Sequence, residues 1–269
     1  MNLGHIDYLN CYPFYYHMFE KRPLKGVSIF SNYPSVLNKM IANGQLDMSP
    51  ISSAAYPDIA DNVLILPQFC LSSIGYVGSV ILVSKAPIED LNGKKIGVTS
   101  ASHTSVVLLK VLLKKYYRHD PIFVPIEPRP VLKDIDAALI IGNDAMVKIP
   151  GPPPYVYDLG DLWLRKTGFP VVFAIFAVRK DIVSKFEFEL NEVILSYQTS
   201  LKYLEQEKHK VILKAKERYP DILYDIDHYY DLLEFQFTDS LKDALMYYYS
   251  TAAEMGFLRE VERLRYMDI

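Results

Sequence analysis

Ser79-Val-Ile-Leu-Val-Ser-Lys85 and Phe173-Ala-Ile-Phe-Ala-Val-Arg-Lys180 share one pattern, an apolar stretch that ends in a basic residue. Short apolar runs rich in β-branched and aromatic residues are typical of buried strands. We interpret the two runs as strands that lead out of one lobe and back into it across a hinge. Residues 85–174 then form an inserted lobe, and residues 1–84 plus 175–269 form the other. The pattern also allows two unrelated core strands of one larger sheet.

Strand-like and helix-like segments alternate around the first of these runs. Pro13 and Pro34 each mark the start of a predicted helix, because the missing N–H of proline needs no partner at the first helical position. Strands are predicted at 3–6, 27–30, 46–49, 63–66, 95–99, 122–126 and 137–141. Helices are predicted at 104–118, 186–207, 211–218 and 238–254. Strands that alternate with helices favour an α/β fold with a mainly parallel sheet covered on both faces.

The composition excludes several classes of protein. The 269 residues are half apolar and carry a formal net charge of -3, with the charges interspersed, so a nucleic-acid partner is not expected. Cys11 and Cys70 form neither a disulfide framework nor a metal-ligand spacing. No apolar stretch reaches the ~20 residues that a membrane span needs, and the N-terminus lacks the pattern of a secretory signal. We therefore expect a cytoplasmic protein with no obligate protein partner.

Five polar loops follow predicted strands and contain neither lysine nor arginine. They cover residues 7–10, 49–53, 72–79, 99–105 and 142–144. In open α/β sheets, ligands bind at the carboxyl ends of the strands, where loops lead into helices. These loops are therefore the candidate binding site.

The loop Thr99–Ser105 places five hydroxyl side chains within seven residues, directly before a predicted helix. Free N–H groups and the positive end of the helix dipole favour a carboxylate or phosphate at such a place. Serine and threonine are also ordinary N-cap residues, so capping alone is the competing explanation. One cap needs one hydroxyl, and five of them favour a small anionic ligand.

Catalytic signals are few. His103 is a candidate base within the hydroxyl loop, while Asp7 and Asp144 are equally well explained as cap or turn residues. The sequence contains no G-x-S-x-G elbow and no G-x-x-x-x-G-K-[ST] phosphate loop. His, Cys and carboxylate side chains are not clustered at metal-ligand spacing, so we expect neither a metal nor a cofactor.

Several blocks of sequence, in order, carry a resemblance to a known family. They include G-H-I-D-Y-L-N-C-Y-P (4–13), D-M-S-P-I-S-S (47–53), G-V-T-S-A-S-H-T-S (97–105) and A-A-L-I-I-G-N-D-A (137–145). From residue 3 to about 181, the chain resembles the chorismate dehydratases of the futalosine route to menaquinone. The resemblance implies a two-lobed periplasmic-binding-protein-like (type II) fold with a central cleft. It also implies that chorismate is the substrate and that it loses water to give 3-[(1-carboxyvinyl)oxy]benzoate.

Carried onto this sequence, the resemblance places the motif asparagine at Asn10, which we expect to be catalytic. The hydroxyl loop is expected to hold one carboxylate of the substrate. The expected substrate-binding residues are Ser52, Ser79, Thr99, Ser102, Thr104, Ser105 and Asn143. Two alternatives stay open: the sister enzyme 1,4-dihydroxy-6-naphthoate synthase, and a non-catalytic protein that binds a small anion.

Overall fold

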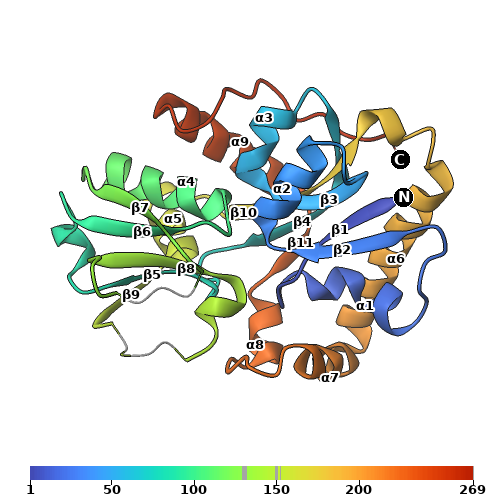
Figure 1. Ribbon diagram of the computed structural model, residues 1–269, viewed down its shortest axis with the longest axis horizontal. Coiled ribbons are helices and arrows are strands. Elements are labelled where there is room, and N and C mark those ends of the chain that lie inside the picture. The colour runs from blue at the N-terminus through green and yellow to red at the C-terminus, as the bar shows by residue number, and fades with distance from the viewer. Residues whose placement is uncertain (129–131, 149–150, 152, 269) are drawn as a thin grey trace.

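The computed structural model describes residues 1–128, 132–148, 151 and 153–268. Its strands form two separate sheets, one on each side of the molecule in Figure 1. The six-stranded sheet has the order β11-β4-β10-β3-β1-β2 and comprises β1 (Asn2–Ile6), β2 (Ser28–Asn32), β3 (Met48–Ser52), β4 (Val63–Ser73), β10 (Val171–Arg179) and β11 (Glu234–Gln236). The five-stranded sheet has the order β7-β6-β8-β5-β9 and comprises β5 (Val80–Ser84), β6 (Lys95–Thr99), β7 (Ile122–Ile126), β8 (Ala137–Ile141) and β9 (Tyr155–Asp158).

Both sheets are mixed, which corrects the expectation of a mainly parallel sheet. β1 runs parallel to β2 and β3, but β10 pairs antiparallel with both β3 and β4. In the other sheet, β6 is parallel to β7 and β8, while β5 is antiparallel to β8 and β9. β5 and β10 each run antiparallel to both of their neighbours. Each begins just after the chain has passed from one sheet to the other.

The two apolar runs that suggested a hinge lie in different sheets. β5 lies wholly in the five-stranded sheet and β10 wholly in the six-stranded sheet, so neither strand crosses between the lobes. The chain passes between the sheets at residues 74–79 and 168–170. The division into residues 1–84 plus 175–269 and residues 85–174 stays a prediction, and sheet membership favours boundaries a few residues earlier.

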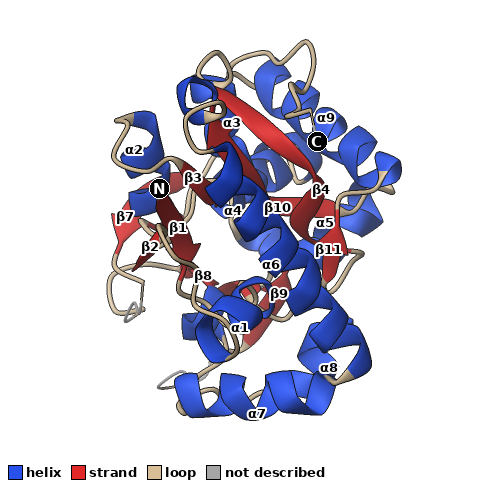
Figure 2. Cartoon of the chain, turned by 90° about the vertical axis from the view of Figure 1, so that its right-hand side faces the viewer, coloured by secondary structure: helices blue, strands red, loops and turns tan. Residues whose placement is uncertain are grey.

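Helices pack against both sheets, and Figure 2 shows them around the strands. They are α1 (Tyr12–Glu20), α2 (Pro34–Ala42), α3 (Tyr56–Ile59), α4 (Thr104–Val111), α5 (Leu159–Thr167), α6 (Glu187–Gln206), α7 (Lys208–Arg218), α8 (Ile226–Asp231) and α9 (Asp239–Glu254). Proline occupies the first turn of α1 and α2, as the sequence predicted. α4 continues as a π-helical turn to Tyr116. The predicted helix is therefore present, and its last turn is π-helical.

Local signals explain where α5 begins and ends. The Asp158 carboxylate accepts a hydrogen bond from the Asp161 N–H and so caps the helix. Gly168 ends it with a φ of 78°, a left-handed conformation that glycine adopts without steric cost. Helix α5 therefore fills the interval between the last strand of the five-stranded sheet and the second crossing of the chain.

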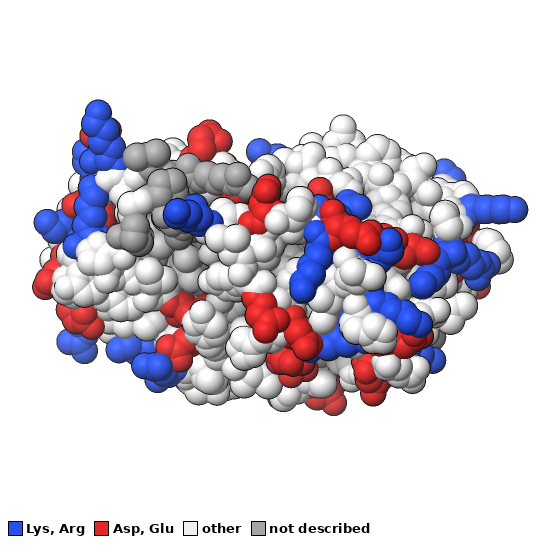
Figure 3. All heavy atoms as spheres, turned by 90° about the horizontal axis from the view of Figure 1, so that it is seen from below, with Lys and Arg blue, Asp and Glu red and all other residues white. Residues whose placement is uncertain are grey.

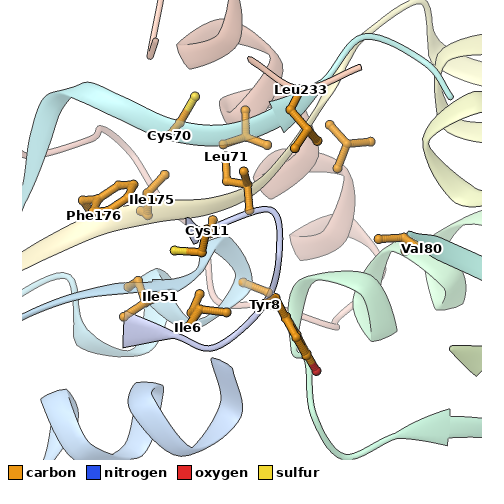
Figure 4. Packing of buried hydrophobic residues seen from close by; sticks show 14 of the residues in the cluster. Ile6, Tyr8, Cys11, Ile51, Cys70, Leu71, Val80, Ile175, Phe176 and Leu233 are labelled. Atoms are coloured by element: carbon orange, nitrogen blue, oxygen red, sulfur yellow. The ribbon is translucent and has the colours of Figure 1, made fainter. Parts of the chain in front are cut away.

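One hydrophobic core runs through both lobes, and a second, smaller cluster around Ile81, Val83 and Ile140 lies on the five-stranded sheet. In the six-stranded lobe, the rings of Phe14, Phe69, Phe176 and Tyr197 pack against one another, with centroids 4.6–6.0 Å apart. Both cysteines are buried and free, and Figure 4 shows them among apolar side chains from several strands. None of the helices within the described residues is long and apolar enough to cross a membrane. On the face shown in Figure 3, acidic and basic side chains are interspersed, as the sequence suggested.

Candidate functional site

A cavity lies where loops from the two lobes meet. The six-stranded lobe contributes Tyr8 and Asn10, which follow β1, and Ser52, which ends β3. The segment that enters the other lobe contributes Ser79, and the start of α4 contributes Ser102 and Ser105. The apolar part of the wall comprises Ile6, Pro34, Leu71, Val77, Val80, Ile141, Phe173, Ala174 and Leu233.

The cavity is narrow in this structure. Its volume is about 40 Å³. None of the lining side chains of the described residues is charged. An anionic ligand in this place is therefore held by hydroxyl, amide and backbone donors, whose hydrogen bonds strengthen when water is excluded.

Five of the eight predicted site residues line this cavity: Asn10, Ser52, Ser79, Ser102 and Ser105. Their roles in binding and catalysis stay predictions. The other three predicted residues, Thr99, Thr104 and Asn143, do not belong to the lining. In this structure, the side chains of these three residues form hydrogen bonds with backbone groups of the protein.

Thr104 and Asn143 connect the two lobes. The Thr104 hydroxyl donates to the Phe173 carbonyl at 2.9 Å and accepts from the Ala54 N–H at 3.2 Å. The Asn143 carbonyl oxygen accepts from the Leu9 N–H at 2.8 Å. The Thr99 hydroxyl, in contrast, accepts from the Ala101 N–H within its own loop.

The wall formed by the start of α4 is loosely hydrogen-bonded. The Ser102 hydroxyl donates to Ser105 Oγ and accepts from the Ser105 N–H, both at 3.3 Å. The His103 N–H donates to Ser52 Oγ at 3.4 Å. These distances exceed the usual 2.7–3.2 Å, so a ligand acceptor can replace the present partners at small cost.

Two buried polar atoms at the cavity have no hydrogen-bond partner among the described residues: the carbonyl oxygen Oδ1 of Asn10 and the hydroxyl of Tyr8. A buried polar atom without a partner costs ~1–3 kcal/mol, so such atoms call for an explanation. Both residues line the same cavity, so a polar ligand there is a candidate partner for these atoms.

Tyr8 is a site residue that the sequence interpretation missed, although it lies in the quoted block 4–13. Its ring packs on Gly142, which has a φ of 60°, and a Cβ at Gly142 would lie 2.6 Å from a ring carbon. Burial raises the pKa of Tyr8 above its usual value, and the nearby Asp144 and Tyr33 raise it further. Tyr8 therefore stays protonated at neutral pH as a hydrogen-bond donor.

Residues after Asp181 reach the cavity. Leu233 lines it, and the Tyr229 hydroxyl donates to Ser79 Oγ at 2.8 Å. The adjacent Tyr230 hydroxyl donates to the Leu9 carbonyl at 3.2 Å. Burial raises the pKa of Tyr229, while its hydrogen bonds with Ser79 and Asn10 oppose that rise. The sequence held no signal for this role, because an aromatic stripe on a helix usually indicates packing.

The charged candidates lie outside the cavity wall. His103 is not among the lining residues; burial lowers its pKa, with Asp58 raising it and Lys110 lowering it. The Asp7 carboxylate accepts hydrogen bonds from Arg218 and Tyr219. Within the described residues, no three His, Cys, Asp or Glu side chains are grouped as metal ligands would be.

A family model described as menaquinone biosynthesis matches residues 1–254. The chain belongs to that family. Of its curated relatives, a protein of Thermus thermophilus named chorismate dehydratase is 29% identical over 201 residues, which cover 66% of this chain and 70% of the relative. A 1,4-dihydroxy-6-naphtoate synthase of the same organism is 24% identical over 146 residues, covering 54% of this chain and 53% of the relative.

Solved structures support the fold of this menaquinone biosynthesis family member. A crystal structure of a protein from Archaeoglobus fulgidus has a TM-score of 0.75 at 20% identity, covering 96% of this chain and 98% of that one. The periplasmic aliphatic sulphonate binding protein of Escherichia coli has a TM-score of 0.67 at 11% identity, covering 100% and 94%. The predicted periplasmic-binding-protein-like α/β fold is thus confirmed.

Proposed function

We propose that this family member is a chorismate dehydratase, a carbon–oxygen lyase that converts chorismate into 3-[(1-carboxyvinyl)oxy]benzoate and water. The observation that carries the proposal is the pairing of an unpartnered Asn10 carbonyl oxygen with a wall of hydroxyl donors in an uncharged cavity. Chorismate has a ring hydroxyl that can donate to that oxygen and carboxylates that can accept from the hydroxyls. The similarity to the Thermus protein supports the same substrate.

The proposed reaction is an elimination. The C–H bond breaks at the ring carbon that bears the enolpyruvyl ether, and its electron pair becomes the new ring double bond as the hydroxyl leaves the neighbouring carbon. The C–O bond of that neighbouring carbon breaks in the same elimination, and the departing hydroxide takes up the proton removed from the ring and leaves as water. Because the ring becomes aromatic, the protein needs chiefly to hold the carboxylates, orient the hydroxyl and exclude water.

The cavity offers no charged side chain as a base among the described residues. We therefore assign the removal of the ring proton to a carboxylate of chorismate itself. In this mechanism, Asn10 Oδ1 accepts from the ring hydroxyl, and Ser102 and Ser105 hold a carboxylate at the positive end of α4. The cytoplasmic location and the absence of an obligate partner expected from the sequence remain part of this proposal.

The direct test mixes the purified protein with chorismate and follows the aromatic product by absorbance and mass. Formation of 3-[(1-carboxyvinyl)oxy]benzoate is the expected result. The sister synthase is the second candidate, since it also matches the chain. Turnover of that enzyme's substrate without turnover of chorismate identifies the chain as a naphthoate synthase, and binding of chorismate without product identifies it as a binding protein.

A further inference from the structure

Tyr229 joins two cavity residues that come from different parts of the chain. It lies on α8, is 1% exposed, and donates its hydroxyl proton to Ser79 Oγ at 2.8 Å. The Asn10 side chain lies beside the same hydroxyl and lowers its pKa, as a donor that faces the phenol oxygen does. One buried phenol therefore contacts both the loop after β1 and the segment that enters the five-stranded sheet.

We propose that Tyr229 is a positioning residue that fixes the Asn10 amide with its carbonyl oxygen toward the substrate. This inference rests on the proposed function, because it states how the catalytic amide of that reaction is oriented. It assigns no contact with the substrate to Tyr229 itself.

The direction of each hydrogen bond follows from counting protons. A tyrosine hydroxyl has one proton, and that of Tyr229 is given to Ser79. Its oxygen can then only accept from Asn10, and the Nδ2 amino group is the only donor that an asparagine side chain has. The Asn10 carbonyl oxygen must consequently point elsewhere, and it is indeed the buried atom without a partner among the described residues.

The same count fixes what Ser79 presents to the cavity. Ser79 Oγ accepts from Tyr229, so its own proton is free to donate. Ser79 lines the cavity, as does Asn10. The arrangement thus offers the ligand one acceptor at Asn10 and one donor at Ser79, which suits a ligand that carries a hydroxyl and a carboxylate.

Tyr229 is held rigidly enough for this task. Asp225 caps α8 by accepting from the Asp227 N–H at 3.0 Å, and the neighbouring Tyr230 is fixed by its hydrogen bond to Leu9. Phenylalanine at position 229 keeps the ring and removes only the hydroxyl. The Asn10 amino group then loses its acceptor, and the amide can rotate so that its donor faces the substrate hydroxyl.

The test compares Tyr229→Phe with Tyr197→Phe. Tyr197 is a matched control because its buried hydroxyl also donates to another side-chain hydroxyl, that of Tyr15 at 2.7 Å, and Tyr197 does not line the cavity. We expect Tyr229→Phe to lower kcat by ~10- to 100-fold with KM changed by less than ~3-fold, because the misplaced amide acts mainly on the transition state. Tyr197→Phe should keep kcat near that of the wild type while losing similar thermal stability.

A double-mutant cycle gives a readout that a purely structural role does not move. In Ser79→Ala, the Tyr229 proton is free to be donated to Asn10 Oδ1, so this variant also permits the wrong amide orientation. The losses in kcat from Ser79→Ala and Tyr229→Phe should therefore be far from additive. Additive losses, or a kcat of Tyr229→Phe within ~2-fold of the wild type, contradict the positioning role.

A measurement without substrate separates this inference from the proposed function. The side-chain amide protons of Asn10, followed by nitrogen-15 NMR, should be protected from solvent exchange in the wild type and exposed in Tyr229→Phe. Protection without chorismate turnover contradicts the function and leaves the positioning role supported. Turnover with unprotected Asn10 protons contradicts the positioning role alone. If Tyr229→Phe does not fold, Ser79→Ala supports the role by altering the Asn10 amide resonances, and unchanged resonances contradict it.

Discussion

The hydroxyl of Thr104 on α4 donates to the carbonyl of Phe173 on β10 at 2.9 Å, and so fastens a helix of one lobe to a strand of the other. Thr104 is 1% exposed and also accepts from the Ala54 N–H. Close by, the Tyr248 hydroxyl of α9 donates to the Thr104 carbonyl at 3.1 Å. Thr104 thus uses both its side-chain hydroxyl and its backbone carbonyl to hold the lobes together around the cavity.

Replacing Thr104 with valine should weaken ligand binding although Thr104 does not line the cavity. The change leaves the Phe173 carbonyl and the Ala54 N–H without their partner, which destabilises this contact between the lobes by ~1–3 kcal/mol. We expect chorismate affinity to fall by ~5- to 100-fold in isothermal titration calorimetry. Thr104→Ser keeps the hydroxyl and should bind nearly as the wild type does. Equal affinity for chorismate in Thr104→Val and the wild type contradicts a role of this contact between the lobes in ligand binding.

Ser105 tests the hydroxyl wall directly. Ser105→Ala removes a side chain that lines the cavity at the start of α4 and that hydrogen-bonds with Ser102. Chorismate affinity should fall by ~5- to 100-fold if a substrate carboxylate loses a buried donor. An unchanged affinity means that the hydroxyl serves only the local structure of the helix start.

Gly142→Ala should displace the Tyr8 ring. A Cβ at Gly142 would lie 2.6–2.8 Å from three ring carbons of Tyr8, and φ there is 60°. Gly168→Ala is the matched control, because φ is 78° but no atom lies within 4 Å of the added Cβ. Both variants should lose ~1–2 kcal/mol of stability through the left-handed backbone conformation, measured by urea unfolding, and Gly142→Ala should lose more through its contact with Tyr8. Only Gly142→Ala should also lower kcat/KM for chorismate, and equal kinetics in the two variants speak against Tyr8 as a site residue.

The tendency of ligands to bind at the carboxyl ends of strands located much of the candidate site from the sequence. Asn10, Ser102 and Ser105 follow strands whose apolar patterns were recognisable, Ser52 is the last residue of another, and all four line the cavity. This tendency places a loop near a ligand site, but it does not give the direction of each side chain. Thr104 therefore looked like Ser105 in the sequence, although its hydroxyl bonds to the other lobe.

The remainder depends on tertiary packing that a sequence pattern does not encode. Tyr229 reaches Ser79 across 150 positions of the chain, and its helix shows only the aromatic pattern that packing helices share. The sequence also did not show which sheet β5 joins, because an apolar strand beside a hinge and a strand inside the adjoining sheet have the same pattern of residues. Its membership follows from pairing with β8 and β9, which are distant in sequence.

The rate on chorismate should be nearly independent of pH between about 7 and 9. His103 has its pKa lowered from 6.5 by burial, so it is already neutral throughout this range. Burial raises the pKa of Tyr8 and of Tyr229 above 10.0, so both stay protonated. A profile of kcat/KM against pH should therefore be flat. An inflection near neutrality indicates an essential titrating base that the proposed mechanism lacks.

The sharpest test of the mechanism compares Asn10→Asp with His103→Ala. Aspartate has nearly the shape of asparagine, but it lacks the Nδ2 donor that meets Tyr229 and adds a negative charge beside an anionic substrate. Asn10→Asp should lower kcat by ~100-fold or more, the size of effect that losing one preorganised polar group beside the reacting atoms produces. His103→Ala should cost far less, because His103 lies outside the cavity wall. Steady-state rates at neutral pH, with a thermal melt of each variant, provide the comparison.

The two variants lead to different conclusions when their rates depart from this expectation. A well-folded but inactive His103→Ala, together with an active Asn10→Asp, makes His103 the base and removes the need for a substrate carboxylate in that role. If both variants are active, the reacting carbon does not lie beside Asn10, and the site belongs elsewhere in the cleft. A strong loss confined to Asn10→Asp is consistent with the substrate's own carboxylate as proton acceptor, because the variant alters orientation and charge while leaving every neutral hydroxyl in place.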